Sequence, residues 1–120
     1  MGDTTAHLRK AEHNKNFLNM IQKNDAGPSF IYPDWMITVS FYIALHYVDA
    51  KLASLSPSLH PRNHPERHTF VSIYLPPDVA EDYLFLESKS KLARYIPDSE
   101  RRISSNIVKK CVNLALNRFV

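Results

Sequence analysis

The chain of 120 residues contains only two glycines and one cysteine. Few glycines argue against a fold made of many tight turns, such as a β-sandwich, and favour long, uninterrupted elements. The single cysteine, Cys111, excludes an intrachain disulfide bond, and without a cysteine cluster the chain has no pattern typical of a structural zinc site. These absences point away from turn-rich and disulfide-linked domains.

The sequence also has no long apolar run. Residues 1–5 lack the apolar core of a signal peptide, and Ala6 stands where N-myristoylation requires Ser or Thr. The most apolar stretch, residues 35–55, is interrupted by ionisable side chains such as His46 and Asp49, which are costly inside a lipid bilayer. We therefore expect a cytoplasmic protein without a membrane span, in which residues 35–55 form a buried core helix.

Length and composition predict a single domain over residues 1–120. Hydrophobic residues make up 44% of the chain and charged residues 22%, which is the usual balance of a globular protein. Charge is unevenly distributed, because residues 87–120 carry eight Lys or Arg against three Asp or Glu. A basic surface of this size suits a phosphate group, but an ordinary solvated helix face has the same composition, so charge alone favours no particular ligand.

Apolar residues recur at helical spacing along nearly the whole chain, which predicts five helices. The predicted helices span about residues 5–24, 35–55, 65–75 and 78–95, and a fifth follows a cap at Asp98 or Ser99 and ends near Phe119. Short connections between helices favour antiparallel neighbours. The predicted fold class is therefore all-α, an antiparallel up-and-down helical bundle.

Capping residues and helix breakers set the predicted ends of these helices. The N-caps of the second, third and fourth helices are predicted to be Asp34, Asn63 or His64, and Asp78. The predicted breakers are Gly27-Pro28, Pro76-Pro77 and Pro97. The core is predicted to include an apolar stripe on the first helix and the aromatic side chains, namely Leu8, Ala11, Phe17, Leu18, Ile21, Trp35 and Phe41.

Polar side chains at helical spacing form a stripe on two of the predicted helices. The stripe of the second helix contains Tyr42, His46, Asp49 and Ala53, and that of the fourth contains Tyr83, Glu87, Ser90 and Arg94. His46 and Asp49 need hydrogen-bond partners if they are buried, and we expect a Tyr, Ser or Arg from a neighbouring helix, with Arg94 as a candidate. One interpretation is an internal polar network that fixes how the helices pack. The other is a binding pocket, lined by Tyr42, His46, Tyr83 and Arg94.

Three histidines, His60, His64 and His68, recur at every fourth position. Imidazoles four residues apart on one helix can bind a divalent metal. Pro61 and Pro65 prevent a single helix from presenting all three, and no cysteine or acidic trio completes a site. We expect no metal site and no cofactor, and a capping or solvated role for these side chains.

The segment 62–68 carries a sharper signal. An arginine that grips phosphate and a histidine that transfers a proton are what metal-free RNA cleavage requires, because the RNA's own 2′-hydroxyl is the nucleophile. Arg62, Asn63 and His68 are the candidate catalytic residues for such an RNase. Arginine and histidine also fall this close together by chance, so the spacing alone is weak.

Taken in order, these segments resemble the HEPN family. Residues 35–53 are similar to its second helix, His64 to the histidine of its following loop, and residues 83–97 to a later helix that ends in Ala-Arg-Tyr. The resemblance covers about residues 5–119 and implies a helical bundle that often forms a homodimer. Family members include metal-independent RNases, often toxins, and non-catalytic partners of small nucleotidyltransferases.

The resemblance implies two functions for this chain. The first is a binding module that contacts a nucleotide or a nucleotidyltransferase-type partner protein in a toxin–antitoxin-like system, with His64 among its binding residues. The alternative is an RNase, because Arg62, Asn63 and His68 match the spacing of the family's nuclease motif. Three departures count against the alternative: the family's motif usually lies nearer the end of the chain, Pro65 interrupts it here, and Phe70 stands where the family commonly has tyrosine.

Overall fold

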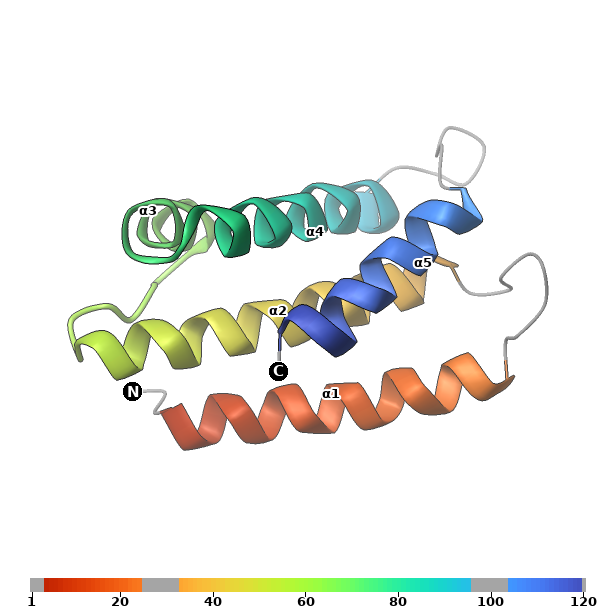
Figure 1. Cartoon of the computed structure of the whole chain (residues 1–120), viewed down its shortest axis with the longest axis horizontal. Helices are drawn as coiled ribbons and strands as arrows, with labels where there is room; N and C mark the ends of the chain where they lie inside the picture. The colour runs from red at the N-terminus through yellow and green to blue at the C-terminus, as the bar shows by residue number, and fades with distance from the viewer. Residues whose placement is uncertain (1–3, 25–32, 96–103, 120) are drawn as a thin grey trace.

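The computed structural model describes residues 4–24, 33–95 and 104–119, and all regular structure in these ranges is helical. The elements are α1 (Thr4–Asn24), α2 (Pro33–Leu55), α3 (His64–Tyr74), α4 (Pro77–Tyr95), α5 (Ser105–Asn113) and a short π-helix, η1 (Leu114–Arg118). The prediction of an all-α fold is confirmed (Figure 1).

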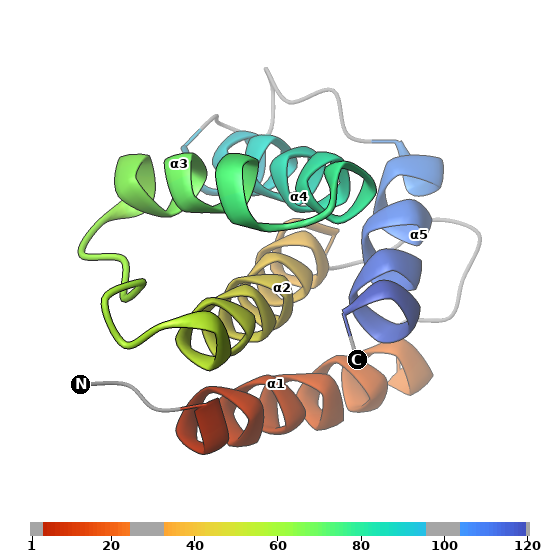
Figure 2. The same cartoon turned by 60° about the vertical axis from the view of Figure 1, so that its left-hand side comes forward.

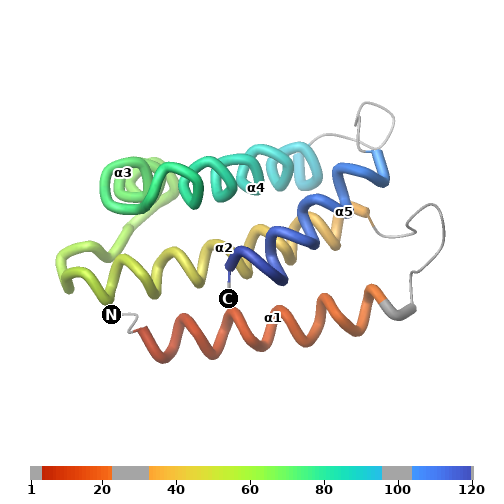
Figure 3. The backbone as a smooth tube through the Cα atoms, viewed as in Figure 1, coloured from red at the N-terminus to blue at the C-terminus, as the bar shows by residue number. Residues whose placement is uncertain are grey.

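Helix α2 is the centre of the molecule, with α1 on one side and α4 on the other (Figure 1). Helices α1, α2 and α4 run alternately in opposite directions, as the smooth backbone trace shows (Figure 3). Helix α3 departs from the predicted up-and-down order, because it is seen end-on in Figure 1 and lies across the end of α4 in Figure 2. Pro76 forces this change of direction: it holds Leu75 in an extended conformation directly after α3.

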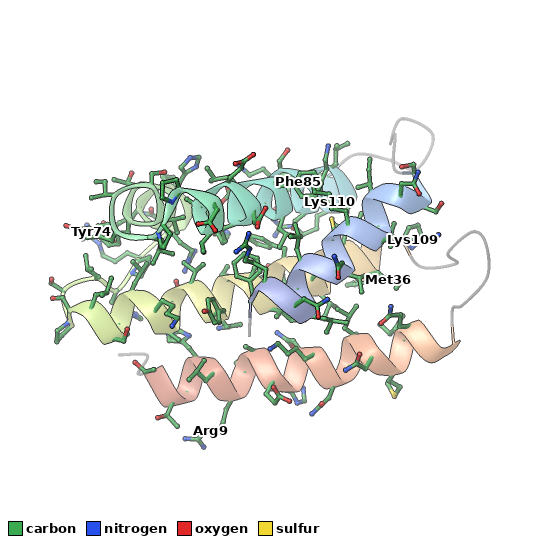
Figure 4. The ribbon with its side chains drawn as sticks, in the orientation of Figure 1. Arg9, Met36, Tyr74, Phe85, Lys109 and Lys110 are labelled. Carbon is green, nitrogen blue, oxygen red and sulfur yellow. The ribbon has the colours of Figure 1, made fainter. Side chains whose placement is uncertain are left out.

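The hydrophobic core surrounds α2 and draws on every helix. The largest fully buried side chains include Leu18, Met36, Phe41, Tyr83 and Phe119. Helix α5 closes the side of the bundle, where Lys110 Nζ lies 4.1 Å from the ring centroid of Phe85 on α4. Both residues are labelled in Figure 4. The predicted core position of Phe41 is confirmed.

Three predicted core residues are instead exposed. Trp35 is 59% exposed, Leu8 45% and Phe17 42%. Helix α1 packs chiefly on α2, so it buries a narrower stripe than a helix enclosed on several sides, and Ala11 and Leu18 carry that stripe. Trp35 lies in the first turn of α2 beside Phe17, at the rim of the α1–α2 interface.

The ends of α1 to α4 agree with the predicted boundaries to within a residue or two. The predicted start of the fifth helix is wrong, because α5 begins at Ser105 and not after a cap at Asp98 or Ser99. Asn63 is the N-cap of α3, and its side chain accepts a hydrogen bond from the Glu66 N–H at 2.8 Å, as predicted. Asp34 and Asp78 are not caps, because α2 and α4 begin one residue earlier at prolines, so both acids lie in the first turn.

Two further predicted boundaries lie outside the described residues. These are the breakers Gly27-Pro28 and Pro97 and the caps Asp98 and Ser99. Within the described part of the chain, Ser104 caps α5 by accepting a hydrogen bond from the Ile107 N–H at 3.2 Å. None of the helices in the described ranges combines the length and the apolar character that crossing a bilayer requires.

Candidate functional site

A buried ion pair joins α2 to α3. Arg67 Nε donates to Asp49 Oδ1 at 2.8 Å, and Arg67 Nη2 donates to Asp49 Oδ2 at 3.1 Å. Burial opposes the charge on Arg67, but the hydrogen bonds to Asp49 outweigh this effect and raise the pKa of Arg67. The predicted partner of Asp49, Arg94, is wrong. Arg67 takes this place because α3 lies across the bundle above α2.

Arg94 instead contacts aromatic residues at the other end of α4. Its Nη1 donates to the Tyr42 hydroxyl at 3.2 Å, and its guanidinium lies 5.6 Å from the ring centroid of Phe41 and 5.0 Å from that of Tyr95. Tyr42 and Arg94, two of the four residues predicted to line a binding pocket, are therefore in contact. The guanidinium is held in place by these rings and by the Ser90 carbonyl, to which its Nε donates at 3.3 Å.

The other two predicted lining residues are buried behind this contact or turned away from it. Tyr83 is fully buried, and its pKa is raised, first by burial and next by the nearby Glu87 carboxylate. His46 turns towards α1, where its Nδ1 lies 3.2 Å from Nδ1 of His7. Tyr42, His46, Tyr83 and Arg94 consequently do not line a single pocket.

His7 and His46 contact each other across the interface between α1 and α2. Burial, and then the charge on a protonated His7, lower the pKa of His46. His60 adds a third imidazole, with a ring centroid 6.2 Å from that of His7. Within the described ranges, no three or more His, Cys, Asp or Glu side chains are grouped so that they could hold a metal ion.

An open groove runs between α3 and α4. Its deeper part has a volume of about 290 Å³ and is lined by His64, Pro65, His68, Glu87 and Lys91. An adjoining part of about 530 Å³ shares three of these residues and adds Leu84, Ser88, Leu92 and Tyr95. We call the two parts together the α3–α4 groove. Both volumes are those of a small-molecule site.

Glu87 lies in the wall shared by both parts of the groove. It is only 5% exposed, and its Oε2 is buried without a hydrogen-bond partner among the described residues. Its other oxygen, Oε1, lies 3.6 Å from His68 Nδ1, a contact that is an ion pair only when His68 is protonated. Ser90 Oγ, on the same face of α4, also makes no hydrogen bond within the described residues, and the Tyr83 hydroxyl has only the nearby Arg67 guanidinium to interact with. Buried polar atoms without partners are rare in folded proteins and mark this face as unusual.

His64 stands at the opposite wall. Its Nδ1 lies 3.4 Å from Arg67 Nη1, and its ring packs 6.1 Å from that of Phe41. Burial, and next the positive charge of Arg67, lower the pKa of His64. His64 is therefore neutral above pH 6.5 and presents one nitrogen as a donor and the other as an acceptor.

The three candidate RNase residues are divided by the fold. Arg62 pairs with Glu66, with Nη2 and Oε2 2.9 Å apart and 82% of its side chain exposed. Asn63 caps α3, as described above. His68 lines the α3–α4 groove, but Arg62 and Asn63 are not among the residues that line it. Arg62 and Asn63 are kept away from the groove because both bind Glu66 in the first turn of α3.

Arg67, Glu87 and Lys91 belong to the groove region but were not predicted as site residues. Arg67 follows the His64-Pro65-Glu66 turn, and only the crossing of α3 over α2 brings it to Asp49. Glu87 belongs to the polar stripe of residues 83–94, and its spacing of four residues from Tyr83 indicated that the two lie on one face of the helix. The sequence did not indicate that Glu87 would be buried. Comparison with protein-family models, curated protein sequences and solved structures gave no match.

Proposed function

We propose that the chain is a HEPN-like binding module that takes a nucleotide in the α3–α4 groove. The observation that carries this proposal is the convergence of His64, His68 and Lys91 around the buried carboxylate of Glu87. Imidazole and ammonium groups at the mouth suit a phosphate. A carboxylate in the wall suits a hydrogen-bond donor, so a ligand that carries both kinds of group fits the groove best.

Binding is favoured over catalysis because the charged groups beneath the groove are already engaged. Arg67 is held by both oxygens of Asp49, and Arg94 is held against Tyr42. Side chains fixed in this way orient a ligand at little entropic cost. Neither arginine is free to move with a reacting phosphate.

The partners implied by the family resemblance belong to the same proposal. They are a second copy of the chain, a nucleotidyltransferase-type protein, or RNA. Light scattering on the purified chain measures its molar mass, and a homodimer gives twice the monomer value of 13.8 kDa. Affinity purification from the native host with the tagged chain tests for the second protein.

Nucleotide binding is tested by calorimetric titration of the pure protein with nucleoside 5′-monophosphates. Lys91→Ala removes the ammonium group at the mouth of the groove, and we expect it to weaken binding about tenfold. Lys109→Ala is the matched control, because Lys109 is exposed on α5 and does not line the groove (Figure 4). Absence of binding by the unmodified protein, or equal loss in both variants, would contradict the proposal.

A second function, metal-independent RNA cleavage, is favoured by one observation. His68 lies in the groove beside a buried carboxylate, and an imidazole paired with a carboxylate can transfer protons to and from a phosphodiester. The engagement of Arg62 with Glu66 counts against the full Arg62, Asn63 and His68 motif. The test is degradation of RNA by the pure protein in EDTA. A His68→Ala variant that cleaves as fast as a control with the exposed His13→Ala removes this mechanism.

A further inference from the structure

We infer that the nucleotide in the α3–α4 groove belongs to a single-stranded nucleic acid, whose neighbouring phosphates cross α4 to a pair of lysines on its other side. The lysine pair consists of Lys89 on α4 and Lys110 on α5. This inference rests on the proposed function, because it adds a second contact to the ligand that the groove takes. It starts from the basic stretch of residues 87–120, of which the groove uses only Lys91 among the lysines and arginines.

The lysine pair converges on one aromatic ring. Lys110 Nζ lies 4.1 Å from the ring centroid of Phe85, and Lys89 Nζ lies 5.5 Å from the same centroid. Each ammonium group is attracted by the ring, but two positive charges that meet there repel each other. Within the described residues, no carboxylate lies at ion-pair distance from either lysine. An anion bound between the two ammonium groups removes this repulsion, so the pair suits a phosphate.

The carboxylates on this side of α4 are already engaged. Arg118 Nε donates to Asp82 Oδ2 at 2.7 Å, and Arg118 Nη1 donates to Asp78 Oδ2 at 3.1 Å. Both acids belong to the first half of α4, and no acidic residue follows Glu87 in the described part of the chain. The second half of α4 and helix α5 therefore form a positively charged surface, as a phosphate backbone requires.

The groove and the lysine pair lie on opposite sides of α4. Figure 2 shows α4 between α3, which forms one wall of the groove, and α5, which carries Lys110. Lys91 in the groove follows Lys89 by two residues, so the two sites are about 3 Å apart along the helix axis. A helix is about 10–12 Å across with its side chains, and a stacked strand carries a phosphate about every 3.4 Å. About three to five nucleotides therefore reach from one site to the other.

An aromatic side chain beside this path favours a nucleic acid over an acidic peptide. Tyr95 lines the wider part of the groove and is 70% exposed. Arg94 lies against its ring at 5.0 Å from the centroid, and the exposed remainder of the ring can stack on a base. Stacking tolerates every base, so we expect no sequence preference. An acidic peptide would meet the same cations but has no base to place on this ring.

Fluorescence anisotropy of labelled pentanucleotides of uridine and of deoxythymidine tests the inference on the unmodified protein, with the matching 5′-monophosphates and a polyglutamate peptide as competitors. We expect each pentanucleotide to bind at least about tenfold more tightly than its monophosphate, because linked contacts act together. Binding of only one of the two strands supports the inference and identifies the sugar that it requires. Equal affinity for pentanucleotide and monophosphate, or equally strong competition by polyglutamate, overturns the inference and leaves nucleotide binding standing.

Lys89→Gln and Lys110→Gln supply the complementary test, each removing one ammonium group of the pair. Lys51→Gln is the matched control, because Lys51 Nζ also lies 5.5 Å from an aromatic centroid, that of Tyr47 on α2. Each variant of the pair should bind the pentanucleotide about fivefold more weakly, and the slope of log affinity against log salt should become shallower by about 0.7. Binding of the monophosphate should not change, because it reaches only the groove.

The outcomes separate this inference from the proposed function. A loss in Lys51→Gln as large as that in either variant of the pair, or an unchanged salt dependence in both, overturns the inference alone. Failure of the unmodified protein to bind either the pentanucleotides or the monophosphates overturns nucleotide binding as well.

Discussion

Two buried carboxylates in this protein are in opposite situations. Asp49 accepts two hydrogen bonds from Arg67, whereas Glu87 has one oxygen without any partner among the described residues. A buried charge is tolerated when its partner is fixed and is costly otherwise. Asp49 therefore holds α3 on α2, whereas Glu87 is a buried carboxylate that its own surroundings compensate only in part.

The first prediction about single residues concerns the stability of the ligand-free protein. Glu87→Gln removes an uncompensated buried charge, so we expect the free energy of unfolding to rise by about 1–2 kcal/mol. Urea denaturation followed by circular dichroism measures the change, with Glu81→Gln as the reference. A marked fall in stability would mean that the carboxylate serves the fold itself.

The second prediction compares two arginines of the same segment. Arg67→Met leaves Asp49 buried and unpaired, so the free energy of unfolding should fall by about 3–5 kcal/mol. Arg62→Met removes an exposed pair with Glu66 and should cost less than about 1 kcal/mol. Equal effects of the two substitutions in urea denaturation would be incompatible with the assigned roles.

At the scale of the helices, the sequence was a good guide to where elements begin and end. Apolar spacing and prolines gave the boundaries of α1 to α4 closely, because capping and backbone sterics act over a few residues. Exposure was harder to predict. Whether Trp35 is covered depends on which helices enclose the start of α2, and no local pattern contains that information.

Helix α1 is joined to α2 partly through a histidine pair, which makes this contact sensitive to pH. Because burial lowers the pKa of His46, the unfolded chain takes up its proton first as the pH falls below 6.5. The unfolded state then binds more protons than the folded state, so stability falls from pH 6.5 downwards and is unaffected by this group at higher pH. The lowered pKa of His64 acts in the same direction.

The corresponding prediction is that His46→Gln makes the stability less dependent on pH between 6.5 and 5. The effect should be modest, because His46 is only partly buried. The control is His13→Gln on the exposed face of α1. Thermal melting at a series of pH values gives the comparison, and identical slopes for His46→Gln and the unmodified chain would refute the role given to this pair.

At the scale of the whole molecule, the groove exists because α3 lies across the end of α4 instead of joining the up-and-down order. The sequence indicated a polar stripe on the fourth helix and a histidine-rich connector. It did not indicate that they would face each other. Arg67 meets Asp49, and His68 meets Glu87, across long stretches of chain, and both contacts depend on the crossing of the helices, which is set by packing across the bundle. Membership of the HEPN family stays a proposal.

The most direct test of the central claim is to map where a nucleotide binds. We would record ¹H–¹⁵N spectra of the labelled protein during titration with guanosine 5′-monophosphate. The account predicts that shifts concentrate on backbone amides of residues 64–68 and 84–95, around the α3–α4 groove. Shifts confined to α1 and the start of α2, or no shifts at millimolar nucleotide, would contradict it.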